Sequence, residues 1–225
     1  CALRQDHRLF CWGGFGQAGV SLVPAPLGTD ADWTQALPHL NGMCGLRAGG
    51  GLHCVGSRLP FMGDGADFST LTRVDDALWS RVSLAYSGDA TCGVRSDGSL
   101  WCIGRNPAGR LGNDLVDKTD WTRIGLENDW LDVTIGGGHS CGLRTGRRGE
   151  SWGTRRHGEL GGGYMVSEAF MSAPVGTQEW VGVLAGFRTT CGWTPDHYLY
   201  CVGTEGAGSM GNGVNGDLAV PLRRI

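Results

Sequence analysis

The sequence has almost no lysine, no concentration of basic charge and no long apolar run. Of its 19 basic residues, 18 are Arg, and they are scattered along a chain whose formal net charge is −3. Nucleic-acid-binding domains usually gather basic residues on one face, which this pattern does not indicate. A membrane-spanning helix needs about 20 consecutive apolar residues, and no run approaches that length. We therefore expect no nucleic-acid partner and no membrane span.

Helical periodicity and the Gly-X-Y period of collagen are also missing, although 41 of the 225 residues are glycine. Frequent tight turns explain this glycine content, because glycine adopts turn conformations at low cost. The 19 aromatic residues, nine of them Trp, exclude a disordered chain. The composition therefore indicates a folded, turn-rich β protein. Because the chain begins at Cys1 without Met, we expect an upstream segment to have been removed or left out.

Eight of the nine cysteines form four pairs with a constant spacing of ten residues. The pairs are Cys1 and Cys11, Cys44 and Cys54, Cys92 and Cys102, and Cys191 and Cys201. A fifth copy begins at Cys141 but has Ser151 at the position of the second cysteine. This regularity indicates that one structural unit is repeated five times.

The run from Cys92 to Cys102 predicts a β-hairpin around the loop Ser96-Asp97-Gly98. A three-residue hairpin loop usually ends in a left-handed residue, a conformation that Gly98 adopts easily. Cys92 then lies opposite Cys102, with Cα atoms about 4.5–5.5 Å apart, which suits a disulfide. Zinc is the alternative, but its sites usually have Cys-x2-4-Cys pairs. We predict four disulfides and hence a secreted, cell-surface or periplasmic location.

The cysteine pattern is part of a longer repeat, with steps of 43 to 50 residues between copies. In four copies a Trp precedes the first cysteine by 11 to 13 residues and opens an alternation of apolar and polar residues typical of a strand. A Gly-rich turn and a further short strand follow each hairpin, which gives about four strands per repeat. Four-stranded sheets repeated at this period are the blades of a β-propeller. We predict one all-β propeller domain over residues 1–225, with repeats that begin near Cys1, Trp33, Trp79, Trp130 and Trp180.

Three runs stand out when the copies are aligned, namely His139-Ser-Cys-Gly-Leu-Arg144, Cys92-Gly-Val-Arg-Ser-Asp-Gly-Ser-Leu-Trp-Cys-Ile-Gly104 and Gly109-Arg-Leu-Gly112. They resemble the repeat of the regulator-of-chromosome-condensation family, and the resemblance covers essentially the whole chain. The cysteine-bearing form is similar to extracellular members, such as the ectodomains of plant crinkly-type receptor kinases. The resemblance implies a seven-bladed propeller that recognises partner proteins.

The number of repeats departs from that expectation. The chain has five Cys hairpins but four Trp strands, since no Trp strand precedes Cys1 and the sequence ends at Ile225, where the next would begin. Two interpretations stay open: a segment of a longer, seven-bladed protein, or a five-bladed ring with one blade completed differently. We favour the segment.

No constellation of side chains predicts catalysis, a cofactor or a metal ion. The G-x-G-x-x-G pattern at Gly14–Gly19 lacks the following helix of a dinucleotide site and returns at Gly206–Gly211, so we interpret both as blade turns. The densest acidic cluster has no Asp-x-Asp-x-Asp spacing of a calcium loop. Its members are Asp64, Asp67, Asp75 and Asp76. We therefore expect a protein that is not an enzyme and that carries no cofactor.

Cys141 is the cysteine without a partner at the expected spacing. In an oxidising compartment an odd cysteine pairs with another chain or stays a free thiol. Three interpretations stay open: an inert buried thiol, a bond to a missing part of the protein or to a partner chain, and a reactive thiol. We favour the inert thiol.

The segments Arg105–Trp121 and Arg144–Arg156 depart most from the repeat. The second is locally basic, which fits either a solvated turn, the interpretation we favour, or a surface for an acidic partner or a polysaccharide. Its candidate residues are Arg147, Arg148, Arg155 and Arg156. Trp193 and Tyr198 are candidates for stacking on sugars. We predict a non-catalytic extracellular module that binds proteins or builds a larger assembly, with a carbohydrate-binding propeller as the alternative.

Overall fold

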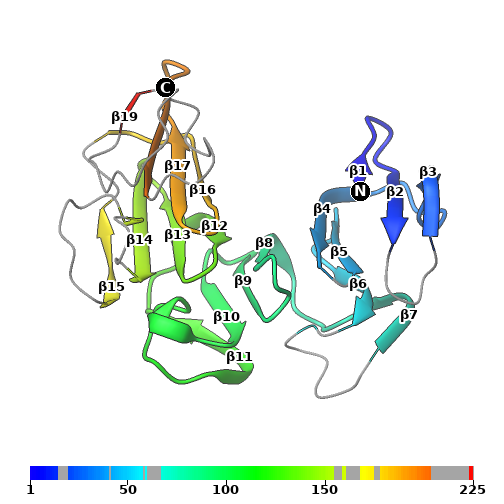
Figure 1. The fold of residues 1–225 in the computed structure, drawn as a ribbon, viewed down its shortest axis with the longest axis horizontal. Coiled ribbons are helices and arrows are strands. Elements are labelled where there is room, and N and C mark those ends of the chain that lie inside the picture. Colours follow the sequence, from blue (N-terminus) through cyan, green and yellow to red (C-terminus); the bar gives the residue numbers. More distant parts are fainter. Residues whose placement is uncertain are drawn as a thin grey trace.

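The computed structural model describes residues 1–14, 20–40, 42–57, 59, 67–154, 159–160, 168–174, 178–203 and 223–224. Within these residues the chain forms five antiparallel sheets and one short 3-10 helix, η3 (Pro107–Gly109). The sheets follow one another in sequence order along an arc, with the first and last sheets at its two ends (Figure 1). The predicted all-β propeller architecture is confirmed.

Each sheet is built from strands that are consecutive in the sequence and pair with their neighbours. The first sheet contains β1 (Ala2–Leu3), β2 (Leu9–Gly14) and β3 (Val20–Pro26); the second, β4 (Trp33–His39), β5 (Gly42–Arg47), β6 (Leu52–Ser57) and β7 (Asp67–Arg73); the third, β8 (Trp79–Leu84), β9 (Ala90–Arg95), β10 (Leu100–Gly104) and β11 (Lys118–Ile124); the fourth, β12 (Trp130–Ile135), β13 (His139–Arg144), β14 (Arg148–Thr154) and β15 (Glu168–Pro174); and the fifth, β16 (Gly182–Ala185), β17 (Thr189–Trp193), β18 (Leu199–Gly203) and β19 (Arg223–Arg224). The first sheet has no Trp strand, as expected from the sequence, so it has three strands and the others have four.

The hairpin of the third sheet has the register expected from its loop. The Arg95 N–H donates to the Ser99 carbonyl over 2.9 Å, and Gly98 is left-handed, with a φ of 79°. Since hydrogen-bonded and non-hydrogen-bonded pairs alternate along an antiparallel ladder, Cys92 and Cys102 form a non-hydrogen-bonded pair. The backbones approach more closely at such pairs. The Cα separation of 4.1 Å is therefore shorter than the range we expected.

All four predicted disulfides are present, and every one closes such a hairpin, with Cα separations of 4.0–4.1 Å. In the fourth sheet Cys141 pairs with Ser151 at the equivalent register, and Cys141 is a buried free thiol. Each disulfide links the two central strands of its sheet, or β1 and β2 in the first sheet. The covalent bonds therefore stabilise single sheets and do not connect neighbouring ones.

The Gly that follows the first cysteine in four repeats has a steric cause. The Trp ring of the adjacent first strand lies directly over this glycine, so that a Cβ there would lie only 2.4–2.7 Å from ring carbons. The four contacts are Trp33 on Gly45, Trp79 on Gly93, Trp130 on Gly142 and Trp180 on Gly192. Each of these Trp side chains is buried, so the Trp–Gly contact is the central packing element of its sheet.

Neighbouring sheets are joined along their first strands β4, β8, β12 and β16, which we call the inner strands. β8 contacts both β4 and β12, and β12 also contacts β16. At each junction a side chain of one inner strand accepts a hydrogen bond from a backbone N–H of the next, over 3.1 Å. The Val82 N–H donates to the Gln35 side-chain carbonyl. The Ile135 N–H donates to the Ser83 hydroxyl, and the Ala185 N–H donates to the Thr134 hydroxyl. These tethers satisfy backbone groups that an edge strand would otherwise leave unpaired.

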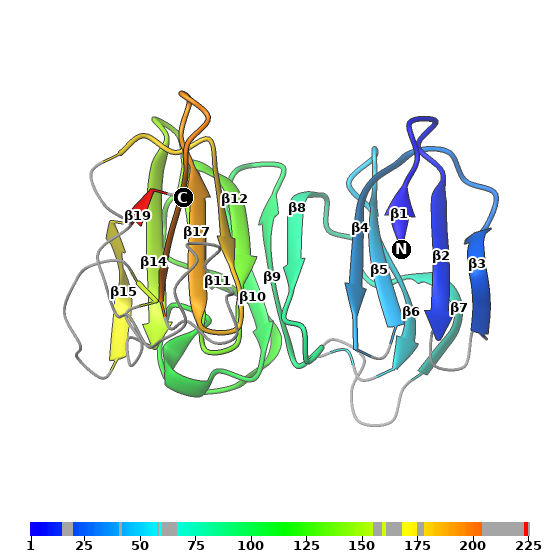
Figure 2. The same cartoon turned by 45° about the horizontal axis from the view of Figure 1, so that its top comes forward.

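The alternating strands give the disc two faces. The loops between the second and third strands of the four-stranded sheets, together with the β1–β2 loop, form what we call the hairpin face. The loops that join first to second and third to fourth strands form what we call the pocket face. Figure 2 shows the β1–β2 and β17–β18 hairpin tips at the upper end and the loop after β10 at the lower end.

Several predicted turns lie wholly or partly outside the described residues. They are the glycine patterns Gly14–Gly19 and Gly206–Gly211, and Asp64 of the acidic cluster. The equivalent Gly109–Gly112 turn of the third sheet is described in full and contains the last residue of η3, with no dinucleotide-type helix after it.

Candidate functional site

A cavity of about 770 Å³ opens on the pocket face, at the ends of the inner strands. The second, third, fourth and fifth sheets all contribute to its wall, because the ends of β4, β8, β12 and β16 converge there. The residues that line the cavity include Leu84, Tyr86, Arg105, Arg110, Ile135 and Phe187. Its volume falls within the range of about 300–1,000 Å³ typical of ligand sites. The cavity therefore marks the candidate functional site.

Large apolar side chains are exposed around this cavity, in the loops that join β4 to β5, β8 to β9 and β16 to β17. Leu40 is 59% exposed, Tyr86 76% and Phe187 74%. The tips are held by contacts between neighbouring sheets: the Leu40 N–H donates to the Tyr86 carbonyl, and the Gly137 N–H donates to the Gly186 carbonyl. Exposed aromatic groups on a fixed backbone are typical of interaction surfaces.

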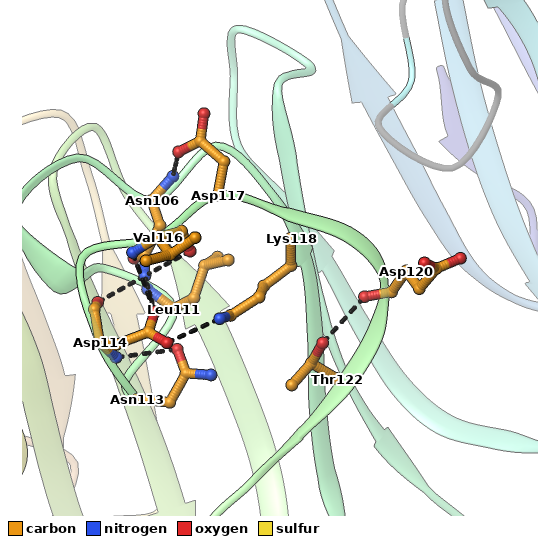
Figure 3. A network of polar contacts seen from close by, with 9 residues as sticks. All are labelled: Asn106, Leu111, Asn113, Asp114, Val116, Asp117, Lys118, Asp120 and Thr122. Carbon is orange, nitrogen blue, oxygen red and sulfur yellow. Dashed lines mark hydrogen bonds and ion pairs between the residues drawn. The ribbon is translucent and has the colours of Figure 1, made fainter.

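The loop that follows β10 forms one wall of the site and is ordered by Asn106. The Asn106 side chain donates to the Asp114 carbonyl and accepts the Leu111 N–H, while its backbone N–H donates to Asp117. Lys118 completes the network through an ion pair of 2.7 Å with Asp114 (Figure 3). Because this network begins at Asn106, between Arg105 and Pro107, and continues to Lys118, it orders the loop that carries these wall residues and Arg110.

Arg110 is the buried anchor of that wall. Its side chain is 2% exposed and lies 2.8 Å from the Asp89 carboxylate. It also donates to the carbonyls of Arg105 and Gly137, each over 3.0 Å. A buried guanidinium that keeps a carboxylate partner avoids the large cost of an unpaired charge. Arg110 therefore connects the third-sheet loop to the β12–β13 loop.

The backbone of Arg110 binds the fourth sheet as well. Its carbonyl accepts hydrogen bonds from the Ser140 hydroxyl over 2.8 Å and from the Trp152 indole N–H over 2.9 Å. Two central strands of the fourth sheet thus hold the same residue. The wall of the site and the packing of the third sheet on the fourth are therefore one structure.

The charged groups of the site differ in how far their charge is neutralised. Burial acts to raise the pKa of Asp89, but the hydrogen bond from Ser87 and the charge of Arg110 outweigh it and lower that pKa. Arg105 is exposed, and its side chain has no hydrogen bond or ion pair to any described residue. Arg188 lies 5.4 Å from the ring of Phe187. The site therefore offers exposed guanidinium groups beside exposed aromatic rings.

The residues singled out from the sequence lie elsewhere. Arg147 and Arg148 are exposed at the β13–β14 hairpin, and Trp193 and Tyr198 flank the β17–β18 loop, all on the hairpin face. Arg155 and Arg156 lie outside the described residues.

Trp193 is the more exposed of the two aromatic candidates, since Tyr198 is half-buried. Its ring lies over Gly182, where a Cβ would come within 2.0 Å, and 37% of the residue remains exposed. Packing on the neighbouring inner strand accounts for one part of the ring. The remaining exposed edge is the surface available to a ligand.

A cluster of buried polar side chains lies at the junction of the fourth and fifth sheets. The His139 imidazole Nε2 and the Thr190 hydroxyl are 2.8 Å apart, and the Cys141 thiol lies 3.4 Å from the same hydroxyl. Burial lowers the pKa of His139 to about 4, against the opposing charge of Glu159. Burial also raises the pKa of Cys141 to about 12. A neutral thiol without solvent access is a poor nucleophile, which supports the interpretation of Cys141 as inert.

Across the described part of the chain, no group of three or more His, Cys, Asp or Glu side chains is arranged to hold a metal ion. None of the helices in that part is long and apolar enough to cross a membrane.

Five successive meander sheets, four of them with a Trp–Gly contact and four with a disulfide-closed hairpin, define a β-propeller segment of the regulator-of-chromosome-condensation type. Among solved structures, the chain is similar to Saccharomyces cerevisiae Prp20p, described with its binding to Gsp1p and histones, with a TM-score of 0.78 and 17% identity over 97% of this chain and 59% of that chain. It is similar to human WBSCR16, with a TM-score of 0.75 and 18% identity over 91% of this chain and 56% of that chain.

The ectodomain of the Physcomitrella patens receptor kinase CR4 is a further match, with a TM-score of 0.50 and 21% identity over 77% of this chain and 42% of that chain. No family model and no curated protein sequence matches the chain. At these identities the likeness establishes the fold. The chain spans 42% to 59% of the length of the three structures described.

Proposed function

We propose that this chain is a non-catalytic, extracellular protein-binding module. In this proposal residues 1–225 belong to one propeller domain, and the pocket face contacts the partner. The observation that carries the proposal is the 770 Å³ cavity with Tyr86 and Phe187 exposed at its rim.

The residue types at this cavity support protein recognition. Aromatic and Arg side chains supply most of the energetically important contacts at protein interfaces. Tyr86 and Phe187 are about three-quarters exposed, so a small ligand in the cavity would leave much of both rings in water. A polypeptide laid across the loop tips would cover them. In keeping with this, Prp20p, a structurally similar protein, is described as binding Gsp1p and histones.

The disulfides support an extracellular location. Four disulfides in one chain are rare in the reducing cytosol and common in secreted or cell-surface proteins. The similarity in fold to a receptor-kinase ectodomain points in the same direction.

Removing the two aromatic rings tests the proposal. Immobilised wild-type chain and a Tyr86→Ala/Phe187→Ala variant are exposed to extracellular proteins of the source, and the captured proteins are quantified by mass spectrometry. The matched control is Leu126→Ala, which removes a still more exposed apolar side chain (88%) from the loop between β11 and β12, away from the pocket face. We expect the control and the wild type to capture the same partner and the double variant to lose it. Equal capture by all three proteins would contradict the proposal.

The partly exposed Trp193 favours carbohydrate binding as a second candidate function. Stacking of a sugar on the exposed edge predicts glycan-array signals that Trp193→Ala abolishes while the four disulfides remain intact. A blank array with the wild-type chain would remove this candidate.

A further inference from the structure

We propose that the pocket-face site binds an acidic segment of its partner polypeptide, with an aromatic or aliphatic side chain between Tyr86 and Phe187 and a neighbouring carboxylate on Arg105. This inference rests on the proposed function and adds the chemistry of the bound segment. The juxtaposition of exposed rings with an unpaired guanidinium carries it.

Charge around the cavity is opposite in sign to that of the whole chain. The charged lining residues are Arg105, Arg110 and Asp89, and Arg188 stacks on the lining Phe187. Two guanidinium groups and one carboxylate thus line the cavity, with the Arg188 guanidinium beside the lining Phe187, on a chain of formal net charge −3. The carboxylate of Asp117, in the loop after β10, accepts a hydrogen bond from the Asn106 N–H. A locally positive site attracts an acidic ligand, whereas the net negative charge of the rest of the chain disfavours binding of that ligand elsewhere.

The guanidinium groups of Arg105 and Arg110 have different environments and different roles in the site. Arg110 is buried, forms an ion pair with Asp89 and donates to two backbone carbonyls, so its guanidinium is a fixed support. Arg105 is tied to the same network only through its backbone: its N–H donates to the Asp89 carbonyl, and its carbonyl accepts from Arg110. Its side chain is exposed and has no partner among the described residues. A guanidinium on a rigid backbone suits a carboxylate, which it binds in a bidentate manner.

The apolar half of the site sets the second requirement. Leu84 and Ile135 line the cavity at the inner-strand ends, and the exposed Tyr86 and Phe187 line it from loops of the third and fifth sheets. Burial of an aliphatic or aromatic side chain against these residues removes exposed apolar area from water. A purely acidic segment would leave the Tyr86 and Phe187 rings exposed, and a purely apolar one would leave Arg105 without a carboxylate.

Selection from a display library of random 12-residue peptides tests the inference on the full chain. We expect enriched sequences that combine Asp or Glu with Phe, Trp, Tyr or Leu. An enriched peptide, labelled and measured by fluorescence anisotropy, should lose affinity about tenfold to hundredfold when its acidic residues become amides, as expected for a hydrogen bond to a charged group. Affinity should also fall with added salt.

Arg105→Glu should cause at least the same loss, and Arg105→Lys should retain part of the affinity. The matched control is Arg147→Glu, an exposed Arg of the hairpin face, which should leave the affinity unchanged. The inference is wrong if the selection enriches neutral or basic peptides, if no peptide is enriched, or if Arg147→Glu weakens binding as much as Arg105→Glu. If no peptide binds but a partner is still captured in a Phe187-dependent manner, the proposed function stands without this inference.

Discussion

Replacing Ser151 with Cys should create a fifth disulfide, to Cys141. The two residues are directly paired in the β13–β14 ladder, at the same register as the four cysteine pairs that are already bonded. The Cα atoms at those four positions are 4.0–4.1 Å apart. The fourth sheet therefore has the backbone geometry of the bond and lacks only its second sulfur.

The expected gain is modest because the closed loop is short. The chain-entropy relation gives about 2.7 kcal/mol at 25 °C for a loop of about ten residues. Against this, the Ser151 hydroxyl donates to the Leu160 carbonyl over 3.0 Å in the native chain, and loss of that bond costs about 1 kcal/mol. A net gain of about 1–2 kcal/mol should raise the melting temperature by roughly 2–8 °C for a chain of this size.

Intact-mass measurement after alkylation in denaturant, without reduction, counts the free thiols. The wild type should take up one label and Ser151→Cys none. The control is the double variant Cys141→Ser/Ser151→Cys, which places the new thiol in the sheet without a partner. The difference in unfolding free energy between this double variant and Cys141→Ser gives the cost of the Ser-to-Cys change. Correcting the free energy of Ser151→Cys for that cost measures the crosslink.

Two labels on Ser151→Cys, with the sheet still folded, would refute the argument that this ladder register dictates disulfide formation. A bond that forms but lowers the melting temperature would instead refute the entropy estimate.

Three further predictions concern the packing between and within the sheets. Gly142→Ala places a methyl group 2.4 Å from a Trp ring and should destabilise by about 1–3 kcal/mol in urea unfolding, whereas Gly49→Ala, which has nothing within 4 Å, should have little effect. Ser83→Ala removes the acceptor of a backbone N–H at the junction of the third and fourth sheets and should cost about 1–3 kcal/mol, against less than about 0.5 kcal/mol for the exposed loop change Ser96→Ala. Since the pKa of His139 is about 4 when folded and 6.5 when unfolded, the unfolded chain takes up the proton first, and stability should fall as the pH drops from 6.5 towards 4, by roughly 2 kcal/mol at pH 5. His139→Gln should flatten this dependence in unfolding curves at pH 7 and pH 5; an unchanged slope would show that other groups cause it.

The hairpins were predictable from the sequence because everything that forms them is local. Ten residues separate the bonded cysteines, and a three-residue loop with Gly98 at its left-handed position determines which residues face each other. The loop rule is also followed where glycine is absent: His7, Arg147 and His197 are left-handed at the same position. Arg147, which the sequence suggested for binding, therefore occupies a position with a backbone requirement of its own.

The contacts between sheets were not predictable, because they join residues far apart in the sequence. The Ser83 hydroxyl accepts the N–H of Ile135, which is 52 residues away. Ser and Thr are common in strands, and nothing in the sequence distinguishes those that face a neighbouring sheet. The Trp–Gly contacts are intermediate, since both residues recur visibly but their stacking follows only from the pairing of the strands.

The candidate site was not predictable for the same reason, although one local signal pointed towards it. Its residues come from different sheets: Tyr86 and Arg105 belong to loops of the third sheet and Phe187 to a loop of the fifth. The signal that the sequence offered was the departure of Arg105–Trp121 from the repeat, since an insertion at this point must form a larger loop. The basic concentration at Arg147 and Arg148 was a compositional signal, and compositional signals do not distinguish the two faces of a disc.

The hydrogen bonds between inner strands have a consequence for how such a protein changes in evolution. The third and fourth sheets each offer a hydroxyl acceptor to the following sheet and a backbone N–H to the preceding one. A duplicated copy of either sheet would thus carry both the backbone N–H donor and the hydroxyl acceptor that the junctions need. It could therefore be inserted between existing sheets. Gene duplication can therefore lengthen the array without a new interface, while the loops of each copy diverge independently of its fold.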